Sequence, residues 1–242
     1  MSTSLNTFFF SVYPYICLTV FLLGSLARFE RAQYTWKSDS SQLLRRAQLR
    51  WGSNLFHIGV LFLLFGHTVG LLTPHALYSV FITASQKQML AIVSGGAAGT
   101  LCFIGLTMLL HRRIFDARIR KTSRRTDLAL LIVLWLQLCL GLLTLPFSYA
   151  QRADAHEMLV LADWAQRIVT LRPDASQMAF VMWPFKLHLV LGMTVFLLFP
   201  FTRLVHIWSG FGTLAYALRP YQLVRSRRLG ANARRNGIRH EM

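Results

Sequence analysis

Four histidines in two long apolar stretches are the residues of this chain whose type and spacing could do chemistry. His57 and His67 are ten residues apart in one stretch, and His188 and His206 are eighteen residues apart in another. An ionisable side chain in a segment of this apolarity is costly and usually functional. Imidazole is a common metal ligand, and two imidazoles from facing helices form the axial ligand set of a haem iron. The pattern therefore points to bound haem.

The elements that must position these histidines are transmembrane helices. The chain is 54% hydrophobic, and its mean hydropathy of +0.44 is too high for an ordinary soluble domain. Five apolar segments are long enough to cross a bilayer, which takes about 20 helical residues. We expect an all-α fold, an integral membrane bundle of five transmembrane helices. The predicted spans are Phe8–Ala27, Gly52–Leu72, Met89–Leu110, Asp127–Ser148 and Val181–Trp208.

The placement of charge predicts the orientation of the bundle. The net charge is +17, and 21 of the 26 Lys and Arg residues lie in the segments 28–51, 111–126 and 203–242. Because basic residues are retained on the cytoplasmic side, we expect the N-terminus outside and the C-terminus in the cytoplasm. A nucleic-acid-binding function is disfavoured, because no basic cluster stands on a soluble fold.

This topology pairs the histidines by depth. The second and fifth spans run antiparallel, so His67 lies level with His188 near the outside, and His57 lies level with His206 near the cytoplasm. Four histidines in two level pairs predict two haems. Since two imidazoles close both axial positions of an iron, such haems suit electron transfer rather than oxygen binding. The alternative is that each histidine only forms a hydrogen bond to a neighbouring helix.

The two pairs do not match in axial spacing. Ten helical residues rise about 15 Å and eighteen rise about 27 Å. Pro200 lies between the fifth-span histidines, and we expect it to kink that helix by freeing the carbonyl of Phe196.

Glycines near the histidines have two expected roles. The spacing of Gly95 and Gly99 is typical of close helix packing. Four other glycines lie near the predicted ligands and are expected to leave room for a flat macrocycle: Gly59, Gly66, Gly70 and Gly192.

Lys87 precedes the third predicted span in a connection that holds no other Lys, Arg, Asp or Glu. It lies level with His67 on the outer side. From the residues alone, an interfacial anchor and a binding-site cation are equally acceptable interpretations.

The segments that contain these residues resemble the gamma subunit, the cytochrome b subunit, of membrane-bound respiratory nitrate reductase. The resemblance runs from about Phe8 to Arg228, and its longest motif contains both fifth-span histidines. The matching motifs are QYTW (Gln33–Trp36), SNLFHIG (Ser53–Gly59), GLLTPH (Gly70–His75), LCFIG (Leu101–Gly105), LHLVLGMTVFLLFPFTRLVHIWS (Leu187–Ser209) and YQLVR (Tyr221–Arg225).

The resemblance implies five helices, two haem b groups and a quinol site near the outer side, with menaquinol or ubiquinol as the substrate. His57 and His206 match the ligands of the proximal haem, and His67 and His188 match those of the distal haem. Lys87 matches a lysine at the quinol pocket of the family.

The resemblance also implies partners and a location. Electrons would pass to a cytoplasmic iron–sulfur beta subunit and a molybdenum-containing alpha subunit that reduces nitrate to nitrite, in anaerobic respiration and nitrate assimilation. The chain would be a multi-pass protein of the bacterial cytoplasmic (inner) membrane, in contact with lipid. We expect residues 1–208 to form the di-haem membrane domain and residues 209–242 a basic cytoplasmic tail that contacts the partner subunits.

Two other functions remain open from the sequence. One is a di-haem, quinol-oxidising anchor of another reductase, such as one that acts on sulfur compounds; the long fifth-span motif favours nitrate reductase. The other is a non-haem transporter that uses its histidines as a proton relay, which would lack a visible spectrum.

Overall fold

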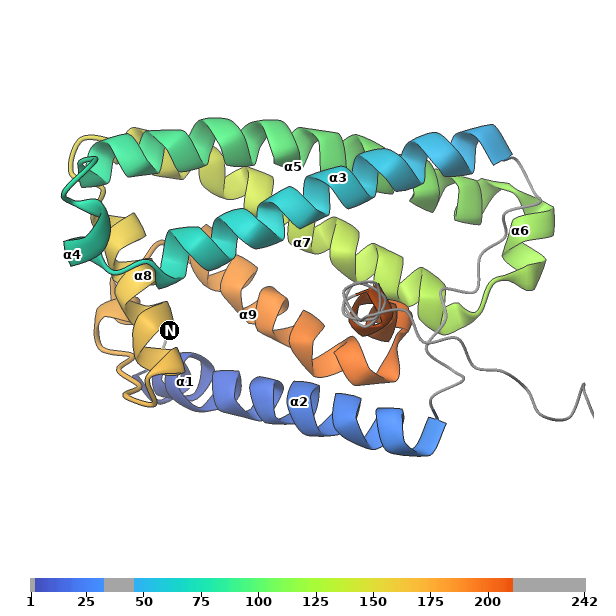
Figure 1. The fold of residues 1–242 in the computed structure, drawn as a ribbon, viewed down its shortest axis with the longest axis horizontal. Coiled ribbons are helices and arrows are strands. Elements are labelled where there is room, and N and C mark those ends of the chain that lie inside the picture. The colour runs from blue at the N-terminus through green and yellow to red at the C-terminus, as the bar shows by residue number, and fades with distance from the viewer. Residues whose placement is uncertain (1–2, 33–45, 211–242) are drawn as a thin grey trace, which may run out of the picture. The chain divides into compact units, whose positions relative to one another are not determined.

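The computed structural model describes residues 3–32 and 46–210. The chain divides into two compact units, residues 1–206 and 207–242, and the fold described below is that of the first. The regular elements in the described residues are all helical, and five helices are long and apolar enough to cross a membrane (Figure 1). The predicted all-α bundle of five spans is thereby confirmed. Its orientation stays a prediction, and the motifs at 33–36 and 221–225 lie outside the described residues, as does the tail from residue 211.

Each span is one long helix or a short series of helical segments. The first comprises α1 (Thr3–Thr7), a π-helical turn η1 (Phe8–Val12) and α2 (Tyr13–Ala32), and the next three are α3 (Arg46–Leu72), α5 (Ala84–Phe115) and α7 (Arg125–Ala150). The fifth is α9 (Trp183–Leu198), followed by the 3₁₀ turns η4 (Phe199–Phe201) and η5 (Arg203–Val205). The connections contain α4 (His75–Tyr78), α6 (Ala117–Thr122), α8 (His156–Val169) and the 3₁₀ turn η3 (Gln177–Ala179).

Short helices mark the two ends of the bundle (Figure 1). We call the end with α4 and α8 the α8 end, and the end with α6 the α6 end. Side chains satisfy the exposed helix termini here. Thr83 and Gln86 form a reciprocal capping box at the start of α5, and the carboxylate of Asp116 accepts from two backbone N–H groups at the start of α6.

Glycines allow α3 and α5 to approach closely. A Cβ added at Gly59 would lie 2.7 Å from the carbonyl oxygen of Ala98 and 2.7 Å from Cβ of Cys102. A Cβ at Gly105 would collide with the backbone of α3 at Gly52 and Phe56. These glycines therefore bring the two backbones together, as small residues do in membrane bundles.

The structure bears out the two expected glycine roles only in part. Gly59 and Gly192 do not leave space for a macrocycle, because Gly59 packs on α5 and a Cβ at Gly192 would lie 3.1 Å from the amide nitrogen of Gln137. A Cβ at Gly66 or Gly70 would meet no described atom within 4 Å, so these positions are open. In the expected packing pair, only Gly99 makes a helix contact, against Leu142, whereas Gly95 faces open space.

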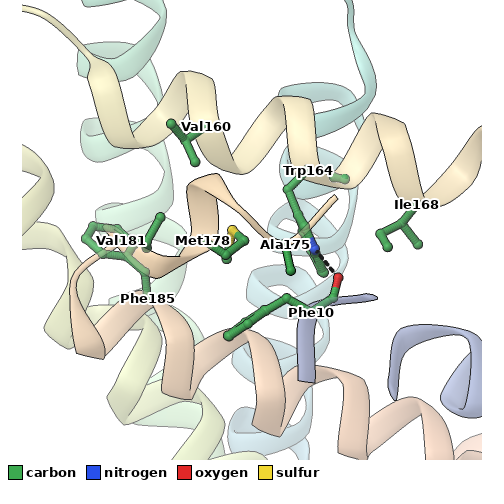
Figure 2. Close-up of a cluster of buried hydrophobic side chains, with 9 residues drawn as sticks. Phe10, Val160, Trp164, Ile168, Ala175, Met178, Val181 and Phe185 are labelled. Atoms are coloured by element: carbon green, nitrogen blue, oxygen red, sulfur yellow. Dashed lines mark hydrogen bonds between the residues drawn. The ribbon is translucent and has the colours of Figure 1, made fainter. Parts of the chain in front are cut away.

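The helix α8 closes the α8 end by burying its apolar face. Val160, Trp164 and Ile168 lie at helical spacing and pack against the core cluster drawn in Figure 2. Trp164 donates its indole N–H to the carbonyl of Phe10 in the π-helical turn, at 2.8 Å. Helix α8 is therefore part of the protein core.

The fifth span is not the continuous helix that was predicted. Helix α9 ends at Leu198, and the N–H of Phe199 donates to the carbonyl of Phe196. That carbonyl is therefore paired rather than freed by Pro200. Thr202 then takes an extended backbone conformation, and helical conformation begins again at His206. The proline breaks the span instead of kinking it.

The contact between α3 and α5 gives a testable prediction. Gly59→Ala should destabilise the protein by about 1–3 kcal/mol, because the new methyl group overpacks a close backbone contact. Gly95→Ala is the matched control, since its methyl group meets open space and should change stability by less than about 1 kcal/mol. Thermal unfolding in detergent measures both variants, and equal melting temperatures would contradict this packing.

Candidate functional site

The structure brings the four membrane histidines together as two facing pairs. The ring centroids of His67 and His188 are 6.1 Å apart, and those of His57 and His206 are 6.4 Å apart. The first pair lies nearer the α8 end and the second nearer the α6 end, since α3 and α9 run in opposite directions (Figure 1). Each pair joins α3 to the fifth span.

These separations suit a metal ion between the rings. An imidazole nitrogen binds a metal at about 2 Å, and the ring centre lies about 1 Å behind it, so two ligands on opposite sides of one ion have centres about 6 Å apart. In the described part of the chain, no group of three or more His, Cys, Asp and Glu could hold a metal ion. A haem iron needs only two protein ligands, because the porphyrin supplies the other four.

The hydrogen bonds of the histidines leave one ring nitrogen available. A carbonyl oxygen can only accept, so a histidine that bonds to one through Nδ1 carries its proton there and presents an unprotonated Nε2. Metal-binding histidines are usually held in this way. All four Nδ1 atoms lie near backbone carbonyls: His57 near Ser53 (2.7 Å), His67 near Leu63 (2.7 Å), His206 near Arg203 (2.6 Å) and His188 near Gln137 (3.2 Å).

Space remains beside the rings on α3. His57 and His67 are both exposed, although they lie within a membrane-length helix. Helix α3 packs mainly on α5, while α9 packs on α2 and α7. Gly66 and Gly70 face open space near His67. The residues present therefore fit a flat, apolar cofactor between α3 and the fifth span.

Helix α7 forms a socket for His188 that the sequence did not reveal. The side-chain amide of Gln137 donates to the carbonyl of His188 at 3.0 Å. In the reverse direction, Nδ1 of His188 lies 3.2 Å from the carbonyl oxygen of Gln137, to which it can donate. One turn along α7, a Cβ at Gly141 would lie 2.9 Å from Cε1 of His188. The sequence signal that could have predicted this contact is a polar residue, Gln137, four positions before a glycine, Gly141, within an apolar span.

A group of charged residues lies beside His206. The carboxylate of Asp127 is 3.8 Å from a guanidinium nitrogen of Arg203 and 3.5 Å from one of Arg113. Since the carbonyl of Arg203 accepts from His206, Asp127 on α7 is connected to this histidine through one residue. The sequence placed Asp127 at the start of a span but gave it no partner.

Lys87 occupies an unusual position at the α8 end. Its Nζ is buried, has no hydrogen-bond partner among the described residues and lies 3.8 Å from the centre of the Tyr78 ring. Burial raises the pKa of the Tyr78 hydroxyl above its ordinary value. A cation–π contact compensates only part of the loss of water around an ammonium. The side chain is thus available to bond to an acceptor that enters beside it.

Comparisons with known proteins agree with this geometry. A model of the family described as nitrate reductase gamma subunit matches residues 6–227. The respiratory nitrate reductase 2 gamma chain of Escherichia coli is 53% identical over 229 residues, which cover 93% of this chain and 98% of the relative. The corresponding gamma chain of nitrate reductase 1 is 51% identical, over 92% of this chain and 98% of the relative.

A more distant relative extends the match beyond one species. The nitrate reductase gamma chain of Bacillus subtilis is 39% identical over 89% of this chain and 96% of its own length. These relatives cover most of the chain, and the range matched by the family model includes all four paired histidines and Lys87. The chain belongs to the nitrate reductase gamma subunit family.

Proposed function

We propose that this chain is the di-haem membrane subunit through which a respiratory nitrate reductase takes electrons from quinol. The observation that carries the proposal is the pair of facing imidazole sets at 6.1 and 6.4 Å. All four rings are held through Nδ1, which leaves each Nε2 without a proton and able to bind a metal. The family supplies the reaction to which this arrangement belongs.

His67 and His188 hold the distal haem in this proposal, and His57 and His206 hold the proximal haem. Bound there, the two groups would carry single electrons along the bundle. The histidines supply neutral imidazoles of fixed tautomer, and the carbonyls that accept from Nδ1 increase their strength as ligands. The apolar helices exclude water from both sites.

The α8 end faces the outside of the bacterial inner membrane and the α6 end faces the cytoplasm. The distribution of basic residues supports this orientation, since 21 of the 26 Lys and Arg residues lie in the sequence segments 28–51, 111–126 and 203–242, which join or follow the spans at their predicted cytoplasmic ends. Quinol is then oxidised near Lys87, and its protons leave on the outer side.

Lys87 binds a quinol oxygen. Its ammonium can donate a charge-assisted hydrogen bond, and the ring of Tyr78 holds it in place at 3.8 Å. A quinol that enters from the lipid provides the acceptor that the described protein atoms do not.

The nitrate chemistry belongs to partner subunits. The whole chain has three cysteines, one fewer than a typical iron–sulfur cluster requires. An iron–sulfur beta subunit therefore receives the electrons on the cytoplasmic side, and a molybdenum-containing alpha subunit reduces nitrate to nitrite.

A visible spectrum separates this proposal from a histidine-relay transporter. Membranes that contain the chain should give sharp b-type bands on reduction. A purified chain without these bands contradicts the proposal.

Replacement of single ligands tests the assignment of the haems. His67→Ala or His188→Ala should remove the distal haem, and His57→Ala or His206→Ala the proximal one. Each variant should retain about half of the haem per chain, measured as pyridine haemochrome, because each iron loses one of its two protein ligands. His111→Ala is the control, because His111 is exposed and belongs to neither histidine pair. A His206→Ala variant that keeps two haems would contradict the assignment.

Replacement of Lys87 tests the quinol site. Lys87→Ala should raise the quinol KM roughly 10- to 100-fold, as expected for the loss of a hydrogen bond to a charged group, while both haem spectra stay intact. Lys121→Ala, at an exposed lysine of α6, should leave the kinetics unchanged. Unaltered quinol oxidation in the Lys87 variant would place the site elsewhere.

Truncation tests whether the basic C-terminal tail contacts the partner subunits. Its YQLVR segment lies outside the described residues, and aromatic and apolar residues interleave with its charge. A chain that ends before Arg219 should release the soluble subunits from membranes yet keep both haems and their reduction by quinol. Membranes that retain the partners and reduce nitrate at the normal rate would show that the tail is not needed for docking.

A further inference from the structure

One face of α2 packs against the break in the fifth span. The ring of Phe21 lies 5.3 Å from that of Phe196 and 4.8 Å from that of Phe199. One turn on, a Cβ at Gly24 would lie 2.8 Å from Cγ of Pro200. Three and four residues apart, Phe21, Gly24 and Arg28 share this face of the helix.

Arg28 binds two backbone carbonyls within the break. A single guanidinium nitrogen, Nη1, is 2.8 Å from the oxygen of Pro200 and 2.8 Å from the oxygen of Thr202. Carbonyls at a helix end have lost their intrahelical donors, and in a bilayer an unpaired carbonyl costs several kcal/mol. Charge-assisted bonds of this length are stronger than neutral ones. Arg28 thus stabilises the backbone path of the broken segment.

This path determines where His206 lies. From His188 to Leu198, α9 rises ten residues, or about 15 Å, the same rise that separates His57 from His67 on α3. An unbroken helix would carry His206 about 12 Å further, beyond the level of His57. The break turns the chain within residues 199–205, and the ring of His206 reaches 6.4 Å from that of His57.

We propose that Arg28 is a positioning residue for the proximal haem ligand. It fixes the Pro200–Thr202 segment to α2, and the Asp127–Arg203 ion pair fixes the next residues to α7. His206 is thereby held on two sides without contact between Arg28 and the haem. The distal pair has no such dependence, because both of its histidines lie in regular helix. This inference rests on the proposed function.

The experiment uses the full chain in membranes with its partners present. Arg28→Gln should selectively alter the proximal haem, as a changed midpoint potential and reduced spectrum or as the loss of about half of the haem per chain. Arg28→Lys keeps the positive charge, so its proximal haem should be closer to that of the wild-type chain than the proximal haem of Arg28→Gln. Arg31→Gln is the matched control, since Arg31 is an exposed arginine one turn further along α2.

A second variant tests the contact between α2 and the Pro200–Thr202 segment without altering the arginine. Gly24→Ala keeps the charge of Arg28 but pushes Pro200 away from α2, so it should alter the proximal haem in the same direction. This variant serves if Arg28→Gln fails to accumulate in membranes. The distal haem acts as an internal control for folding in every variant.

The possible outcomes separate this inference from the proposed function. If the wild-type chain binds no haem, the proposed function fails. If it binds two haems and both Arg28→Gln and Gly24→Ala match Arg31→Gln in haem content, spectrum and potential, the inference is wrong. Equal loss of both haems also overturns it, because Arg28 would then support the whole bundle rather than one ligand.

Discussion

The separation of about 6 Å between facing imidazole rings is the constraint on which the rest of the bundle depends. Helices α3 and α9 do not pack closely against each other, and the histidines of α3 face His188 on α9 and His206 beyond η5 across ring distances of 6.1 and 6.4 Å. Other helices must therefore hold them apart and in register. The glycine contact between α3 and α5 positions one set of ligands, and the contacts of α9 with α7 and α2 position the other.

The two histidine pairs meet this constraint in different ways. At the α8 end, both partners lie in regular helix, and α7 steadies His188 through Gln137 and Gly141. At the α6 end, the fifth span is broken, and polar side chains replace the missing helical hydrogen bonds. A buried charge is costly in a membrane, so arginine and aspartate are found here where each has a partner. Broken helices in membranes are tolerated where such compensation exists.

The sequence predicted the number and composition of the spans, and it predicted which histidines would lie level with each other. Both follow from patterns that are local in sequence: apolar length, charge distribution and helical rise. The sequence failed where the outcome depends on contacts between distant segments. Pro200 was expected to kink a continuous helix, but the interactions of Phe196 with Phe199 and of Arg28 with the backbone favour a complete break. The packing role of Gly59 was missed for the same reason, since nothing near it in sequence identifies Ala98 and Cys102 as its neighbours.

His188 differs from the other three histidines in the origin of its carbonyl partner. His57, His67 and His206 bond to carbonyls three or four residues earlier in their own chain segment, so each ring is oriented by the backbone that carries it. His188 bonds to a carbonyl on α7. Any sliding of α7 along α9 therefore changes the hydrogen bond that orients this ring, whereas the rings of the other three histidines are oriented by carbonyls of their own segments. Of the four histidines, His188 is the one whose electronic properties report the relative position of two helices.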